Sequence, residues 1–390
     1  METNSIVITC AKGITPYLKQ ELHSLGFPVV AETVASVVTH GDLNDAMRLN
    51  LFLRTGHRVL LLLKEFHARN ADDLYKELFH MHWEEYISED GYLSVTSSVD
   101  TPSITDSRYA NVKCKDAIVD RILNVCGRRP DSGPDRGRCV VYLYWKDSSC
   151  IVYLDTSGEP LSKRGYRKIP LRAPMQETLA AAVIMATGWQ GSTDFVNPMC
   201  GSGTLAIEAA LIALGKAPGL LRHNFSFMHY LGYSAAVWET MRLDAEKTVL
   251  PQLAISIMAS DNNPEAVDAA GNNARAAGVA DCITFDVCDF TDTDLPGHGG
   301  IVLLNPEYGE RMGSEEALEH TYAAIGDFFK QRCRGYTGYI FTGNSALSKK
   351  VGLRPKRRLP FFNADIECRL LEYELYEGTR KAKYQDQSVS

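Results

Sequence analysis

Apolar runs of strand length recur along the first 160 residues and alternate with helical patterns. The runs are rich in β-branched and aromatic side chains, which are typical of strands, and they cover residues 6–10, 29–38, 59–66, 92–99, 139–145 and 149–158. Amphipathic patterns over residues 15–26, 43–56 and 71–87 predict helices. The pattern as a whole predicts an α+β region made of two small subdomains that meet near residues 60–70.

A polar and basic segment at about residues 156–170 is predicted to be a linker, and the pattern changes after it. Short apolar runs now close on polar residues or glycine, at residues 194–203, 255–264, 283–290, 300–309 and 338–345. Helical patterns over residues 174–189, 204–214, 264–278 and 317–333 separate them. Strands that alternate with helices predict a mostly parallel, doubly wound α/β sheet, whose ligands bind at the carboxyl ends of the strands.

The composition is that of a folded protein in a reducing compartment. Of the 390 residues, 45% are hydrophobic and 23% are charged, which excludes wholesale disorder. No apolar run approaches the ~18 residues of a membrane span, and the first residues show no secretory signal pattern. The ten cysteines include no C-x-x-C pair, so we expect free thiols in a cytoplasmic protein. We assign no metal, because His80 and His82 have no third ligand nearby in the sequence.

The net charge of −7 argues against a nucleic-acid partner, but the distribution of charge favours one. Residues 108–138 hold eight basic side chains against four acidic ones, and residues 163–172 and 349–358 hold five and six basic side chains with no acid. Basic patches on an acidic body neutralise phosphates, because salt screens the distant acids. An alternative for each single patch is a solvated loop. The candidate RNA contacts are Arg128, Arg129, Arg138, Lys163, Arg164 and Arg167.

The segment Asn197-Pro198-Met199-Cys200-Gly201-Ser202-Gly203-Thr204 lies between a predicted strand and a predicted helix. Its two glycines let the backbone turn tightly and approach a ligand, and the helix offers its positive end to an anionic group. With Ala206 the segment also fits the G-x-G-x-x-A pattern of a dinucleotide site. A plain structural turn would look similar, so the loop alone does not decide between these ligands.

The next strands also end in polar residues. Asp261, followed by Asn262, can accept both hydroxyls of a ribose or cap the helix that begins at Pro264, and Asp289 can meet an adenine amine or cap its own loop. A dinucleotide fold places its acid ~20 residues after the glycines, whereas Asp261 follows Gly201 by 60 residues.

The apolar run over residues 300–309 ends in Asn305-Pro306-Glu307-Tyr308, a turn that predicts a side-chain amide and an aromatic ring in the cleft. This pair suits a planar base whose exocyclic amine is the target of the reaction. A set of polar ligands at four successive strand ends favours a binding site over four unrelated turns.

Five segments carry a resemblance to a known family: KRGYRKIPLRAPMQETLAAAVI, NPMCGSGTLAIEAALIA, APGLLRHNFSF, NPEYGERMG and FTGNSALSKKVGLRPKRRLPFFNADIECRLLEYELY. In these segments the chain resembles THUMP-domain class I RNA methyltransferases that use S-adenosylmethionine. It is most similar to those that make N2-methylguanine in 23S rRNA. The resemblance implies that the target-amine motif comprises Asn305, Pro306 and Tyr308. It implies cofactor contacts at Thr178, Pro198, Cys200, Gly201, Gly203, Thr204, Asp261, Asn262, Asp289 and Asn305. The chain departs from the family at Asn197, usually Asp, and at Glu307, usually Pro.

The resemblance also implies a domain organisation. We expect an N-terminal α+β subdomain over residues 1–65, a THUMP-like RNA-binding domain over 66–160, and a Rossmann-like class I methyltransferase domain over 161–390. The expected partner is RNA, with ribosomal RNA favoured and tRNA as the alternative. The other functions left open are an adenine-N6 methyltransferase, a non-catalytic RNA-binding or assembly protein, and a nicotinamide oxidoreductase, which the 60-residue spacing and the NPEY turn disfavour.

Overall fold

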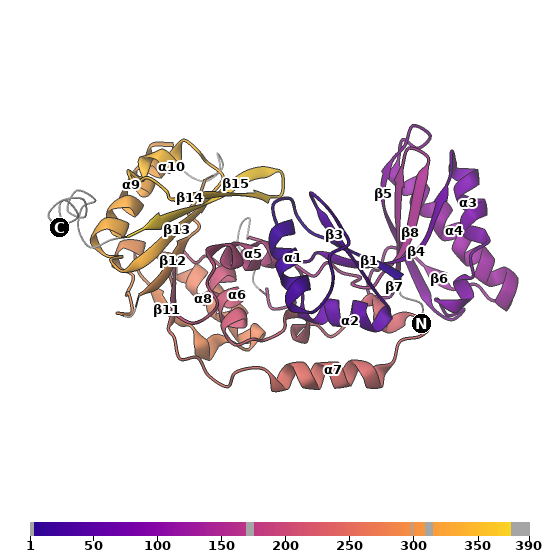
Figure 1. Ribbon diagram of the computed structural model, residues 1–390, viewed down its shortest axis with the longest axis horizontal. Helices are drawn as coiled ribbons and strands as arrows, with labels where there is room; N and C mark the ends of the chain where they lie inside the picture. Colours follow the sequence, from indigo (N-terminus) through magenta and orange to yellow (C-terminus); the bar gives the residue numbers. More distant parts are fainter. Residues whose placement is uncertain (1–3, 169–174, 298, 309–314, 376–390) are drawn as a thin grey trace, which may run out of the picture. The chain divides into compact units, whose positions relative to one another are not determined.

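The computed structural model describes residues 4–168, 175–297, 299–308 and 315–375. Contacts along the chain divide it into two compact units, each with its own sheet (Figure 1). The first unit takes residues 1–10, 18–164 and 217–247, and the second takes 11–17, 165–216 and 248–390. The segment 217–247 lies within the range predicted for the methyltransferase domain, 161–390, but in the structure it packs with the N-terminal residues.

One sheet runs through the whole first unit in the order β2-β3-β1-β4-β8-β7-β5-β6. The ten-residue strand β4 joins its two halves, because residues 58–61 pair with β1 and residues 60–67 pair with β8. The predicted strand over residues 29–38 is a hairpin of two strands, β2 and β3. The strands are β1 (Asn4–Thr9), β2 (Ala31–Thr33), β3 (Ser36–Gly41), β4 (Arg58–His67), β5 (Tyr92–Asp100), β6 (Asp131–Ser132), β7 (Cys139–Lys146) and β8 (Ser149–Asp155).

The helices of the first unit include α2 (Leu43–Phe52), α3 (Ala71–Phe79), α4 (Ser107–Cys126) and residues 18–24 of α1 (Thr15–Ser24), whose first residues belong to the second unit. A capping box fixes the start of α2, where Asp42 and Asp45 each accept a backbone N–H of the other at 3.0 Å. The helix predicted over residues 71–87 ends at Phe79. A short 3-10 turn follows in which Trp83 is fully buried and donates its indole N–H to the carbonyl of Leu78 at 2.7 Å.

The segment 217–247, with helix α7 (Ala235–Lys247), is bound to the first unit through backbone and side chains. The Arg222 guanidinium donates to the carbonyls of Ser157, Glu159 and Pro160 at 3.0–3.1 Å. The buried hydroxyl of Tyr230 donates to the carbonyl of Val140 at 2.6 Å. Backbone carbonyls leave little freedom of position, so these bonds fix the segment against strand β7.

The expected linker at residues 156–170 is largely buried where the structure describes it. The Thr156 hydroxyl donates to the carbonyl of Val59 at 2.7 Å, and the Ser157 hydroxyl donates to the Asn50 side chain at 2.6 Å. Tyr166 is also buried. The segment does contain the boundary between the two units, which falls between residues 164 and 165. Its polar residues, however, satisfy buried hydrogen bonds instead of contacting water.

The sheet of the second unit has the order β11-β10-β9-β12-β13-β15-β14. Neighbours from β11 to β13 are parallel, and β15 and β14 are added antiparallel. The chain runs outward from β9 to β11 and returns to β12, so the carboxyl end of β9 is the point at which a doubly wound sheet binds ligands. The strands are β9 (Asp194–Pro198), β10 (Ile257–Asp261), β11 (Thr284–Val287), β12 (Gly300–Leu304), β13 (Tyr336–Thr342), β14 (Arg357–Asn363) and β15 (Ile366–Glu374).

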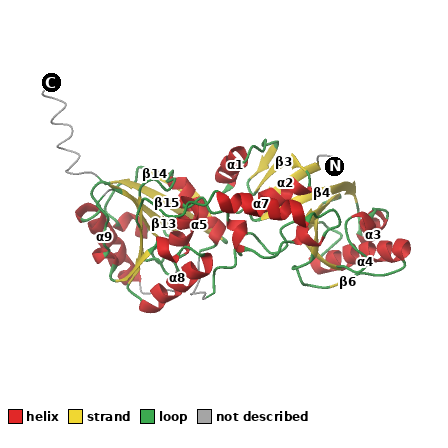
Figure 2. Ribbon diagram, turned by 90° about the horizontal axis from the view of Figure 1, so that it is seen from below, coloured by secondary structure: helices red, strands yellow, loops and turns green. Residues whose placement is uncertain are grey.

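Helices cover both faces of this sheet, as the Rossmann-like prediction requires. Figure 2 shows α9 (Glu315–Gln331) on one side of the strands and α5 (Glu177–Thr187) and α8 (Pro264–Ala277) on the other. Tyr322, Ile325 and Phe329 of α9 pack with side chains of β12, β13 and β15. Helix α6 (Thr204–Ala213) follows β9, and the short α10 (Leu347–Lys350) follows β13. Among the described residues, no helix is long and apolar enough to cross a membrane.

Candidate active site

The glycine loop between β9 and α6 is a left-handed turn. The φ angles are +57° at Met199, +54° at Gly201 and +82° at Gly203. Its backbone is tied down at both ends, since the Cys200 N–H donates to the carbonyl of Ser260 and the Gly203 N–H donates to the carbonyl of Cys200, both at 2.9 Å. The sequence pattern did not predict the positive φ of Met199. A non-glycine residue with positive φ is strained, and such strain gathers at functional sites.

The two glycines serve different purposes. A Cβ on Gly203 would lie 2.8 Å from the Cβ of Ala270, so this position lets α6 pack closely on α8. A Cβ on Gly201 would meet no atom of the described residues within 4 Å. Gly201 is therefore needed for its backbone conformation, and the space beside it is open to a ligand at the edge of the sheet.

Asp261, at the end of β10, holds this loop in place. One carboxylate oxygen accepts the N–H of Gly201 at 2.9 Å, and the other accepts the N–H of Asn263 at 3.0 Å. The cap of α8 is Asn263, whose side chain accepts the N–H of Glu265 at 3.0 Å. The alternative in which Asp261 caps α8 was therefore wrong. Asn262 is exposed beside the carboxylate.

Asp289 lies just after β11, the strand next to β10, and caps its own loop. Its Oδ1 accepts both the N–H and the hydroxyl of Thr291, at 2.9 and 2.6 Å. The N–H of Cys288 donates to the carbonyl of Asp261 at 3.2 Å, which brings the two strand ends together. Asp289 is exposed, so a carboxylate that caps the turn is also open to a ligand at this edge.

Asn305 follows β12, next to the glycine loop. The buried side chain of Asn197 joins the two strands, because its Nδ2 donates to the carbonyl of Leu303 at 2.8 Å. An amide makes this bond, whereas an ionised Asp at position 197 would be an acceptor only. Pro306 is buried and Glu307 is exposed. Among the described residues, the buried Oδ1 of Asn305 has no hydrogen-bond partner. Unpaired buried acceptors are costly, so this oxygen is a candidate for binding a donor on a substrate.

Tyr308 is held by strands that the sequence did not predict. Its hydroxyl accepts from the Asn363 amide at 3.0 Å and from the Cys368 thiol at 3.7 Å. Its ring packs on Gly343, where a Cβ would lie 2.8 Å from a ring carbon, and meets Phe341 edge-on with centroids 6.4 Å apart. Burial raises the pKa of the Tyr308 hydroxyl, so the phenol stays neutral. Residues 309–313 of the NPEYGERMG motif lie outside the described residues.

Two of the expected RNA contacts are paired within the protein: Arg164 is buried and Arg167 is half-buried. Arg164 is 1% exposed, and its guanidinium donates to the carbonyl of Arg54 at 2.7 Å. Arg167 donates to the carbonyl of Met175 at 2.6 Å and to the hydroxyl of Thr204 at 3.2 Å. Guanidinium donors that already bond to the protein are less available to a phosphate. Burial therefore corrects the expectation for Arg164, which is structural. Arg167 supports the start of α6, and its contact with RNA stays a prediction.

The segment before α5 is bound to the helices around the glycine loop. The Tyr166 hydroxyl donates to the buried carboxylate of Glu208 at 3.0 Å, and the Lys168 N–H donates to the Asn273 side chain at 2.9 Å. Arg167 forms an ion pair with Glu177 at 3.5 Å. Thr178 follows Glu177 in the first turn of α5 and is buried. The described side chains of Tyr166 and Arg167 thus support the helices around the glycine loop.

The other expected RNA contacts are exposed. Arg128 pairs with Asp90, and Lys163 pairs with Glu159. Arg129 lies 3.9 Å from the carboxylate of Asp116. Arg138 is exposed and has no carboxylate within 4 Å among the described residues. Exposed pairs of this kind are weak, so the arginines are available to exchange a carboxylate for a phosphate.

Comparisons with known proteins agree with this geometry. The family model described as "RMKL-like, methyltransferase domain" matches residues 164–372, the RlmL ferredoxin-like domain matches 5–60, and the THUMP domain matches 68–155. A Synechocystis protein, slr0064, provisionally named an RNA methyltransferase, is 34% identical over 96% of this chain and 97% of its own length. The crystal structure of SMU.472, provisionally named a methyltransferase and complexed with SAH, has a TM-score of 0.88 at 27% identity and covers 97% of this chain and 100% of its own.

A third relative is longer. The ribosomal RNA large subunit methyltransferase K/L of Syntrophotalea carbinolica is 37% identical over 95% of this chain and 53% of its own length. The present chain thus spans about half the length of that curated relative.

A parallel sheet whose order reverses at β9, with a glycine loop at that point and acids on the next two strands, defines a class I methyltransferase domain. A THUMP domain precedes it. The chain belongs to the RMKL-like methyltransferase family.

Proposed function

We propose that the chain transfers a methyl group from S-adenosylmethionine to the N2 amine of a guanine in 23S rRNA. The observation that carries the proposal is the buried, unpaired Oδ1 of Asn305 beside the glycine loop. The name of the K/L relative and the THUMP match support RNA as the substrate, and the SAH complex of SMU.472 supports the cofactor.

The residues around the glycine loop fit the cofactor. The open space beside Gly201 suits the methionine end, and the carboxylates of Asp261 and Asp289 suit a ribose and an adenine amine. Pro198, Cys200 and Thr204 place the loop between β9 and α6. When bound, S-adenosylmethionine supplies a methyl group already activated by a sulfonium.

The protein has then to hold a poor nucleophile in line with the methyl group. The lone pair of a guanine amine is delocalised into the ring, and the Oδ1 of Asn305 accepts an amine N–H and favours a tetrahedral nitrogen. Such an acceptor strengthens as the nitrogen becomes positive. The neutral ring of Tyr308 offers a surface on which a base that has left its stack can lie. Alignment supplies much of the acceleration, so no strong acid or base is required.

The test compares Asn305→Ala and Asn305→Asp with the wild type in single-turnover methylation of large-subunit RNA from cells that lack the gene. Loss of one preorganised partner costs about 10²–10³ in rate, and we expect this loss in Asn305→Ala with a smaller change in RNA affinity. Mass spectrometry identifies the product. An Asn305→Ala enzyme with the wild-type rate refutes the assignment of this motif.

Glu307 gives a second test of the same motif. Because its side chain is exposed, we infer that it replaces the family's proline without contacting the base. Glu307→Pro should then keep or slightly raise the rate, since proline stiffens the turn, and Glu307→Gln should be neutral. A large loss in both variants would show that the carboxylate accepts a proton donor of the guanine.

Two rival substrates are distinguished by the product itself. N6-methyladenine in place of N2-methylguanine would identify an adenine methyltransferase, and a product found only in tRNA would move the substrate to tRNA. An inactive but RNA-binding wild type would favour an assembly protein. Mapping the nucleoside that disappears from rRNA and tRNA of a deletion strain decides among them, and imaging of a tagged chain tests the expected cytoplasmic location.

A further inference from the structure

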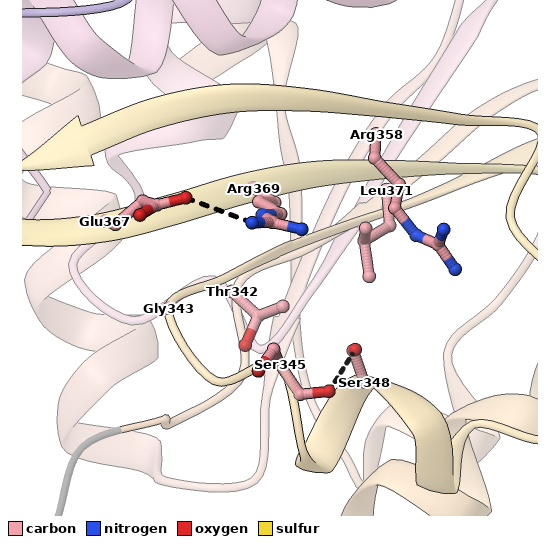
Figure 3. A pocket seen from close by; sticks show the side chains of 8 residues that line it. All are labelled: Thr342, Gly343, Ser345, Ser348, Arg358, Glu367, Arg369 and Leu371. Carbon is pink, nitrogen blue, oxygen red and sulfur yellow. Dashed lines mark hydrogen bonds and ion pairs between the residues drawn. The ribbon is translucent and has the colours of Figure 1, made fainter.

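A polar pocket of about 190 Å³ lies beside the target-amine motif, at the carboxyl end of β13. Gly343 belongs to both, because it lines the pocket and also packs against the ring of Tyr308. Figure 3 shows Arg358 and Arg369 on the β14–β15 hairpin at one side of the pocket and the side chains of Ser345 and Ser348 at the other.

Arg358, which lines the pocket, differs from other cations of the basic segment because no acid in the described part of the chain pairs with it. Within residues 349–358, Lys350 pairs with Glu319 at 2.8 Å, and Lys356 and Arg357 pair with the buried Glu372. Lys356 also pairs with Glu374, so three acids balance these three cations. Arg358 is exposed and has no carboxylate within 4 Å among the described residues.

A second guanidinium is oriented toward the same space. Arg369 gives one N–H to Glu367 at 3.1 Å, which leaves its other donors for a ligand. With two arginines against one glutamate, the lining keeps a formal charge of +1. The Ser348 hydroxyl now donates to the carbonyl of Ser345 at 2.8 Å and can turn toward an acceptor.

We propose that this pocket binds a phosphodiester group of the RNA strand that carries the target guanine, an inference that rests on the proposed function. A single negative charge with several acceptor oxygens matches a net charge of +1 surrounded by guanidinium and hydroxyl donors. Because Gly343 belongs both to the pocket and to the seat of Tyr308, the phosphate contact sets the position of the base relative to Asn305. The pocket is thus a positioning site that holds the backbone while the base enters the cleft.

The test uses the full chain and the unmethylated large-subunit RNA described above. Arg358→Ala and Ser348→Ala remove a charged and a neutral donor from the pocket. The matched control is Arg354→Ala, which removes the same charge from an exposed position of the same basic segment outside the pocket lining. Circular dichroism checks that each variant is folded.

We expect Arg358→Ala to weaken RNA binding about five- to tenfold at low salt and to reduce the slope of log affinity against log salt by about 0.7, the value for one phosphate contact on a single strand. Ser348→Ala should weaken binding about two- to fivefold with no change in slope. The KM for RNA should rise more than kcat falls in both variants, and Arg354→Ala should bind within twofold of the wild type.

An Arg358→Ala protein that binds RNA as Arg354→Ala does would overturn the proposal, because the effect would then be one of general charge. The proposal would also fail if Ser348→Ala bound RNA with wild-type affinity while Arg358→Ala and Arg354→Ala lost the same amount of affinity. The result is separable from the proposed function: if the wild type methylates no RNA, the proposed function fails, while the binding comparison still decides whether the pocket holds a phosphate.

Discussion

Replacement of Asp261 by alanine should affect both the glycine loop and the cofactor. The carboxylate accepts the N–H groups of Gly201 and Asn263 at 2.9 and 3.0 Å. Hydrogen bonds to a charged group contribute roughly 1.5–3 kcal/mol each. Because Asp261 is partly exposed and water can replace it at the amides, we take the lower end for both bonds and expect a loss of about 3 kcal/mol in the free energy of unfolding. If the same carboxylate binds the ribose hydroxyls, S-adenosylmethionine affinity should fall tenfold or more, about 1.4 kcal/mol.

Two measurements separate these effects. Chemical denaturation gives the loss of stability, and calorimetric titration of the folded variant gives the affinity. Asp268→Ala is the control, since Asp268 is an exposed aspartate on α8 beside the site, and it should change neither quantity. Unchanged S-adenosylmethionine affinity in a folded Asp261→Ala protein would refute a ribose contact, and tight binding of NAD instead would refute the class of cofactor.

Three further predictions concern the first unit. Charge reversal at Arg128, Arg129 and Arg138 should weaken RNA binding and flatten its salt dependence without changing S-adenosylmethionine affinity, because phosphate contacts are salt-dependent; an unchanged salt slope would show a merely solvated surface. Arg222→Ala should lower the stability of the first unit by about 3–5 kcal/mol in denaturation experiments, since it removes a charged donor from three carbonyls and leaves them unpaired. Burial lowers the pKa of His57 to about 4, so the unfolded chain binds a proton first as the pH falls below about 6.5. Stability should therefore drop by about 2 kcal/mol between pH 6.5 and 4.5, and His57→Gln should show a smaller drop.

The sequence alone determined the class of fold and the places where the site would form. Strand and helix periods differ, so the alternation after residue 170 predicted the parallel sheet, and glycines or polar residues marked the strand ends that the structure brings to one edge. The hairpin of β14 and β15 was missed. Its Arg357, Arg358 and Arg369 interrupt the apolar pattern of a strand, and the fold pairs Arg357 with Glu372, which lies 15 residues away in the sequence.

Tertiary structure alone decided which charges are available and which segments belong together. Arg164 and Arg138 look alike in the sequence, yet one is buried against the carbonyl of Arg54 and the other is exposed. The segment 217–247 packs within the first unit because Arg222 donates hydrogen bonds to carbonyls at residues 157–160. The burial of a side chain and its hydrogen-bond or ion-pair partners depend on atoms that are distant along the chain, so a local sequence pattern does not predict them. Local propensity therefore specifies the strands and the loop, and long-range contacts specify which polar groups remain free to act.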